Sequence, residues 1–185
     1  MGTYIKTCAE IKTANGWKPV SYGVFPPVPW HDMDEYEKPE FSEPFGFQNY
    51  GMFGLFAGVR NYSHSQVLAE LRRLPDDISE EALLHLVPEI LQLDNYGWGW
   101  VEPSLPATVS ERISRSDADS YGYSWLSASE LTEFDYDQTF TDQRTEPPET
   151  STYRDFLGER YFLHLDALKA LSVNDEVRVL FCFLG

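Results

Sequence analysis

The chain has 185 residues, of which 42% are hydrophobic and 15% aromatic, and its formal net charge at pH 7 is −16. This length suits one domain with a substantial core, and the composition excludes a disordered chain. The negative charge argues against direct binding to nucleic acid, because phosphate groups require a basic surface.

The sequence also points to a compartment. No stretch approaches the roughly 20 apolar residues of a membrane span, and the N-terminus lacks the apolar run of a signal peptide. Two cysteines, Cys8 and Cys182, are too few for a disulfide framework. We therefore expect a cytoplasmic protein that makes no membrane contact.

The N-terminal part predicts a β-hairpin. Residues 3–12 alternate between two faces, which is the pattern of a strand. Asn15-Gly16 is a strong turn signal, and residues 17–24 then form the returning strand. Residues 25–46 contain several prolines and many acids, so we expect a long loop there.

Three helices are expected next. Residues 50–59 are apolar and rich in glycine, which favours a buried helix. Ser63 to Gln66 has the spacing of a capping box, so a helix is expected from there to Leu74. Asp77 to Glu80 is a second such box, and its helix should run to about residue 86 or 93.

Two aromatic and glycine-rich stretches follow, at residues 95–100 and 121–125, and both are interpreted as flexible loops. Between them, residues 101–120 read as a polar loop. Ser127 to Glu130 is a capping box for a short helix that ends near residue 134.

The C-terminal part predicts an acidic loop, a helix and a strand. The loop covers residues 135–150, and the helix covers residues 152–171 with Gly158 as its weak point. Residues 176–184 are apolar on both faces, which is typical of a central strand. We expect a single α+β domain, residues 1–185, in which the N-terminal hairpin and the C-terminal strand share one mostly antiparallel sheet with helices packed on it.

Several blocks of sequence occur in a characteristic order: Met1-Gly2 with Ile5, Tyr50 to Asn61, Leu74 to Ser79, Ser124 to Leu126 with Glu130-Leu131, Phe134 to Asp137, Thr152 to Glu159, and Val177 to Phe181. Together they resemble a family of uncharacterised proteins of tailed phages and prophages, many of which begin Met-Gly-Cys-Asp-Ile-His. Where these relatives often have Cys, Asp and His near the N-terminus, this chain has Thr3, Tyr4 and Lys6. Tyr121 to Tyr123 likewise replaces a His-Ser stretch. The resemblance implies a phage or prophage protein and no established activity.

The sequence offers little support for catalysis. The histidines at positions 31, 64, 85 and 164 fall in no metal-ligand spacing, so we expect no metal and no cofactor. There is no nucleophile elbow and no phosphate-binding loop. Cys182 sits in an apolar run, where burial would raise the pKa of its thiol and leave it inert.

The aromatic stretches are the strongest indication of a binding site, because Tyr and Trp are common interface anchors. The opposite interpretation is that their rings fill the core and that the nearby arginines pair with acids. We predict that the following residues contact a ligand or partner: Arg60, Asn61, Trp98, Trp100, Tyr121, Tyr123, Trp125, Asp135, Asp137 and Arg154.

Three functions remain open. The first is a non-catalytic phage accessory protein that binds a host protein or a small signalling molecule, for example as a counter-defence inhibitor. The second is a small-molecule hydrolase or transferase in which Asp135 and Asp137 perform acid–base chemistry and Arg60 or Arg154 holds an anion. The third is an acidic inhibitor that imitates DNA. The acids of that imitation would be Glu130, Glu133, Asp135, Asp137, Asp142, Glu146 and Glu149. Partner and oligomeric state stay open.

Overall fold

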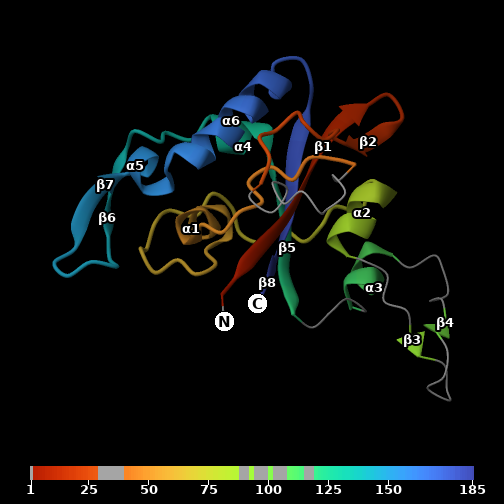
Figure 1. The fold of residues 1–185 in the computed structure, drawn as a ribbon, viewed down its shortest axis with the longest axis horizontal. Coiled ribbons are helices and arrows are strands. Elements are labelled where there is room, and N and C mark those ends of the chain that lie inside the picture. Colours follow the sequence, from red (N-terminus) through yellow and green to blue (C-terminus); the bar gives the residue numbers. More distant parts are fainter. Residues whose placement is uncertain (1, 29–39, 88–91, 94–99, 102–107, 115–118) are drawn as a thin grey trace.

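The structure of the protein is a computed structural model, and it describes residues 2–28, 40–87, 92–93, 100–101, 108–114 and 119–185. Its centre is a four-stranded antiparallel sheet in the order β2-β1-β8-β5 (Figure 1). The strands are β1 (Tyr4–Thr13), β2 (Gly16–Pro19), β8 (Val177–Leu184) and β5 (Ser120–Ser127). The predicted α+β class is confirmed, with the hairpin and the C-terminal strand in one sheet.

The N-terminal hairpin turns one residue earlier than its sequence suggests. Thr13 pairs with Gly16, so Ala14 and Asn15 form the two-residue turn. Gly16 has φ +108°, a value that glycine adopts without strain. The returning strand is also shorter than the expected residues 17–24, because it ends at Pro19.

Strand β8 is the central strand that its two apolar faces predict. It pairs with β1 on one side and β5 on the other, and only its last residue is not fully buried. Phe181 and Phe183 belong to the larger of two hydrophobic cores, while Leu180 and Cys182 belong to the smaller one. Because neighbouring residues of a strand face opposite sides, the two cores lie on the two faces of the sheet.

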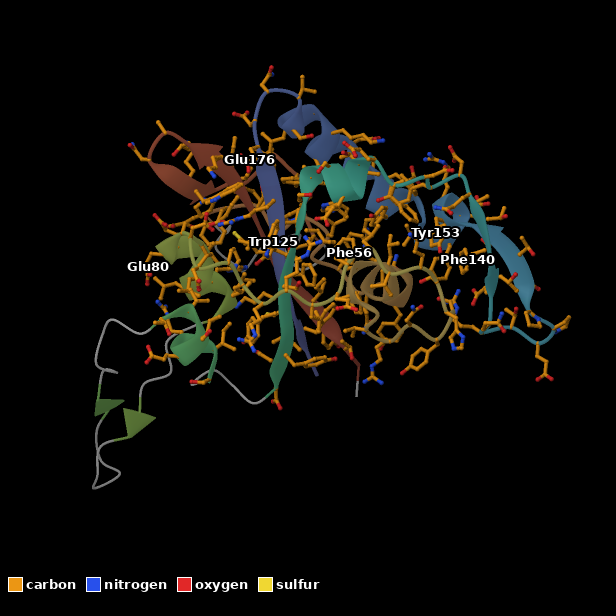
Figure 2. The ribbon with its side chains drawn as sticks, turned by 180° about the vertical axis from the view of Figure 1, so that it is seen from behind. Phe56, Glu80, Trp125, Phe140, Tyr153 and Glu176 are labelled. Atoms are coloured by element: carbon orange, nitrogen blue, oxygen red, sulfur yellow. The ribbon has the colours of Figure 1, made fainter. Side chains whose placement is uncertain are left out.

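Helices cover both faces (Figure 1). One face carries α1 (Tyr50–Ala57), α4 (Ala128–Thr132), α5 (Tyr153–Leu157) and α6 (Glu159–Ser172). The other face carries α2 (Glu80–Leu86) and α3 (Val109–Ser114). The ring of Phe56 on α1 meets that of Phe181 with 5.6 Å between centroids, and Figure 2 shows Phe56 between α1 and the sheet. None of the helices in the described ranges is long and apolar enough to cross a membrane.

Local signals set several helix ends. Ser127 and Glu130 form the predicted capping box of α4, and Ser79 caps α2. The single helix expected over residues 152–171 is instead two helices. Gly158 separates α5 from α6 with φ +78° and ψ 168°, which no helix can continue.

The helix expected from Ser63 to Leu74 does not form, and that prediction is wrong. Residues 66–74 form neither helix nor strand, and we name this segment the strap. Several of its backbone N–H groups donate to side chains or carbonyls of other elements. That of Gln66 donates to the hydroxyl of Tyr153, that of Leu68 to the carbonyl of Leu55, and that of Arg72 to Ser124 Oγ.

The strap passes from one face of the sheet to the other. Leu68 packs on the core beneath α1, whereas Leu74 belongs to the core beneath α2. Between them, Arg72 meets Ser124 on the edge strand β5, where the strap runs close to Trp125 in Figure 2. The strap therefore wraps around the outer edge of β5.

Short elements occur within the expected loops. Helix α3 lies inside residues 101–120, and strand β6 (Thr139–Asp142) lies inside residues 135–150. Strand β6 pairs with β7 (Glu149–Thr152) as a ribbon apart from the main sheet (Figure 1). Strands β3 (Gln92–Leu93) and β4 (Trp100–Val101) form another small pair.

Candidate functional site

The aromatic stretch at residues 121–125 is part of strand β5, so the prediction of a flexible loop there is wrong. Tyr121 pairs with Phe183 and Ser124 with Phe181, which places one extra residue on β5. Gly122 accommodates this bulge with φ +64°. A Cβ at Gly122 would lie 2.9 Å from a ring carbon of Phe183, so the strands approach closely because that side chain is absent.

The aromatic rings of this stretch differ in how deeply they are buried. Tyr123 is buried in the core beneath α2. Trp125 is half-buried, and the guanidinium of Arg72 lies 5.0 Å from its ring and pairs with Glu130. Tyr121 remains 38% exposed. Of the rings on β5 that were predicted to meet a ligand, Tyr121 is therefore the accessible one.

The other aromatic stretch, residues 95–100, lies almost entirely outside the described residues. Trp98 lies outside the described residues. Trp100 belongs to β4, but its side chain also lies outside what the structure describes.

Tyr121 lies in a group of polar and aromatic side chains around Arg60. Arg60 Nε donates to Thr3 Oγ1 at 2.9 Å, and Arg60 Nη1 donates to the Tyr62 hydroxyl at 2.8 Å. The hydroxyls of Tyr121 and Thr3 lie 3.5 Å apart, and the hydroxyl of Tyr50 accepts from the Thr3 N–H at 3.4 Å. We name these five residues, Thr3, Tyr50, Arg60, Tyr62 and Tyr121, the Arg60 cluster.

The electrostatic setting of Arg60 differs from that of many other arginines in the chain. The hydrogen bond with Tyr62 raises the pKa of Arg60, so its exposed guanidinium stays charged. Within the described part of the chain, no carboxylate pairs with it. Carboxylates do pair with Arg72, Arg112, Arg144, Arg154 and Arg178. Arg60 thus places on a protein of net charge −16 a positive charge that has no ionic partner among the described residues.

Asn61, also predicted to bind, has a structural role. Its side-chain oxygen accepts from the N–H and the hydroxyl of Ser65, and its amide nitrogen donates to the Ser65 carbonyl. A Cβ at Gly54 would lie 2.8 Å from that oxygen, so Asn61 packs directly on helix α1. Asn61 therefore positions the loop that carries Arg60, and its polar atoms are already occupied.

Asp135, Asp137 and Arg154 form a separate group on the surface. Arg154 Nε donates to Asp137 at 2.7 Å, and the Asp137 N–H donates to Asp135 at 3.0 Å. The bond from Arg154 lowers the pKa of Asp137, so this carboxyl is ionised at neutral pH and is poorly suited to donate a proton. Among the described residues, no hydrogen bond, ion pair or ring contact joins this group to the Arg60 cluster.

A hollow of about 300 Å³ lies beside the first turn of α1. Its walls are Gln48, Asn49, Tyr50, Gly51, Arg144 and Phe156. The guanidinium of Arg144 lies 4.8 Å from the ring of Phe156 and pairs with Asp142 at 2.6 Å. The hollow cannot be predicted from local sequence, because its walls come from three segments that are far apart in the chain and share no pattern.

Other candidate chemistry has less support in the geometry. In the described ranges, no group of three or more His, Cys, Asp or Glu side chains is arranged to hold a metal ion. Burial raises the pKa of Cys182 to about 12, as its apolar surroundings predict, so its thiol stays protonated. Three acids of the supposed DNA-like array, Glu130, Asp137 and Asp142, are engaged in ion pairs.

Comparison with protein-family models, with curated proteins and with solved structures finds no match to this chain. Its function is therefore inferred from the chain's own side chains.

Proposed function

We propose that the chain is a non-catalytic accessory protein of a phage or prophage. It acts in the bacterial cytoplasm by binding a host protein or a small signalling molecule, as a counter-defence inhibitor would, and the Arg60 cluster is its contact surface. One observation carries this proposal. Arg60 is exposed and charged, it has no carboxylate partner in the described part of the chain, and tyrosine hydroxyls surround it.

The composition of the cluster suits recognition. Arg and Tyr are the residues most often found at binding hot spots, since each combines a large flat surface with directed hydrogen bonds. Tyr62 is 54% exposed and Tyr121 is 38% exposed, so their rings are available to a partner. Since the described partners of the guanidinium are hydroxyls, it can accept an anionic group without first breaking an ion pair with any of them.

The enzymatic alternative gains less from the structure. Its two carboxylates are exposed, and Asp137 is already tied to Arg154. An acid–base pair is expected instead in a cleft where the two pKa values are pushed apart.

Affinity capture from bacterial lysate tests the proposal. The protein, its Arg60→Gln variant and an Arg73→Gln control are immobilised, and retained proteins and small molecules are identified by mass spectrometry. Arg73 is also exposed, and it is no part of the cluster. We expect one partner or molecule to be retained by the parent protein and the control and lost by Arg60→Gln. Equal retention by all three would remove the Arg60 cluster as the contact surface.

A further inference from the structure

The hollow beside α1 and the Arg60 cluster adjoin through shared side chains. Tyr50 lines the hollow, while its hydroxyl meets Thr3 and its ring faces that of Tyr62 with centroids 6.5 Å apart. Gln48 also lines the hollow, and its side-chain amide donates to the Thr3 carbonyl at 3.0 Å. The two features are therefore neighbouring parts of one surface.

The part around Arg60 suits a phosphate group. Two of its guanidinium nitrogens, Nε and Nη1, donate to Thr3 and Tyr62. No hydrogen-bond acceptor within the described ranges meets the third nitrogen, Nη2. The hydroxyls of Tyr62 and Tyr121 can donate as well. Several donors around one positive charge match the terminal oxygens of a phosphate, each of which accepts hydrogen bonds.

The hollow suits an uncharged planar ring. Its volume of about 300 Å³ lies at the lower end of the range for small-molecule sites. The rings of Tyr50 and Phe156 and the flat guanidinium of Arg144 line it. Asp142 balances the charge of Arg144, so this part favours stacking rather than a second anion.

Gly51 fixes the wall of the hollow. A Cβ at this position would lie 2.6 Å from a ring carbon of Phe156, so the ring rests on the backbone of α1. Because Phe156 is held in this way, the hollow exists before any ligand arrives, and little binding energy is spent on forming it.

We infer that the hollow and the Arg60 cluster together bind a small molecule in which a phosphate is attached to a planar ring, the class of the nucleoside monophosphates. This inference rests on the proposed function, because it takes the Arg60 cluster as the contact surface. The phosphate binds at Arg60 and the planar ring binds against Phe156.

Calorimetric titration with three probes tests the inference. Adenosine 5′-monophosphate carries both parts, ribose 5-phosphate carries only the anion, and adenosine carries only the ring. We expect the monophosphate to bind at least about tenfold more tightly than either fragment, since each part of the site contributes its own contacts. Guanosine and uridine monophosphates then report which ring is preferred.

Two variants assign the parts of the site. Arg60→Gln should weaken binding of the monophosphate at least about tenfold and remove binding of ribose 5-phosphate, because a charge-assisted hydrogen bond is lost. Phe156→Leu should reduce the difference in binding affinity between the monophosphate and ribose 5-phosphate. Arg73→Gln should match the parent protein, and circular dichroism confirms that each variant is folded.

Two outcomes overturn the inference. No heat of binding from any of the three monophosphates would exclude this ligand class, and equal affinity for ribose 5-phosphate and the monophosphate would exclude the hollow. The proposed function fails separately. If capture from lysate still depends on Arg60 but no monophosphate binds, the Arg60 cluster remains supported as the contact surface and the inferred ligand class is wrong.

Discussion

Acid should weaken this protein through one buried histidine, His164 of α6. The side chain is fully buried, and its Nδ1 accepts a hydrogen bond from the N–H of Phe45 at 3.1 Å. The rings of Phe25, Phe45 and Phe47 lie 5.4 to 6.4 Å from its own ring. Burial, assisted by the charge of Arg160, lowers the pKa of His164 from 6.5 to about 4.

The size of the effect follows from this pKa difference. The unfolded chain takes up a proton near pH 6.5, whereas the folded chain resists it until about pH 4. The stability due to neutral His164 is therefore complete above pH 6.5 and is lost as the pH falls towards 4. At about 1.4 kcal/mol per pH unit, the loss is about 2 kcal/mol at pH 5 and about 3 kcal/mol at pH 4.

The variant His164→Asn isolates this effect. Its side-chain oxygen can replace Nδ1 as the acceptor for the Phe45 N–H, and it does not titrate. Urea unfolding of both proteins is measured at pH 7.5, 6.5 and 5. Carboxylates that lose ion pairs in acid do so in both proteins, so they cancel in the difference.

Between pH 7.5 and 5, we expect the free energy of unfolding of the parent protein to fall by about 2 kcal/mol relative to the variant. Parallel curves over this range would refute the reasoning, because they would mean that His164 titrates equally in the folded and unfolded chains.

Three further predictions concern stability and reactivity. Arg178→Met leaves the buried carboxylate of Glu10 without its ion-pair partner at 2.7 Å, and urea unfolding should show a loss of about 3–5 kcal/mol; a loss below about 1 kcal/mol would mean that water reaches the carboxylate. Gly122→Ala adds a Cβ at a residue with φ +64°, 2.9 Å from a ring carbon of Phe183, so the free energy of unfolding should fall by about 1–3 kcal/mol in the same assay. An unchanged unfolding midpoint would show that the bulge relaxes to accept the methyl group. Burial raises the pKa of Cys182 to about 12, so a thiol reagent at pH 8 should label it at least about a hundredfold faster in urea than in the native protein; equal rates would contradict the burial.

Much of the fold can be predicted from the sequence where the local sequence pattern and the tertiary contacts favour the same structure. Residues 176–184 are apolar on both faces and form the central strand, and Ser127 with Glu130 caps α4 as its spacing predicts. Residues 63–74 carry a comparable helix signal, yet they form no helix. The partners that decide this, such as Tyr153 and Ser124, come from distant strands and helices that no local pattern reveals.

Only part of the candidate site can be predicted from the sequence. Arg60 and Tyr121 were both expected to contact a ligand, and the fold brings them into one cluster. Thr3, Tyr50 and Tyr62 were missed, although Tyr62 lies only two residues from Arg60. These residues meet because α1 packs beside the sheet, and the spacing of residues along the chain does not predict that packing.

The strap also matters for how molecules of this protein meet one another. Strand β5 ends the sheet, spans eight residues and carries no charged side chain, a combination that invites a neighbouring chain to add a strand of its own. Arg72 of the strap sits against the middle of that strand at Ser124, and the bulge at Gly122 bends what lies beyond it. The strap and the bulge therefore obstruct the addition of a neighbouring molecule's strand along this part of β5.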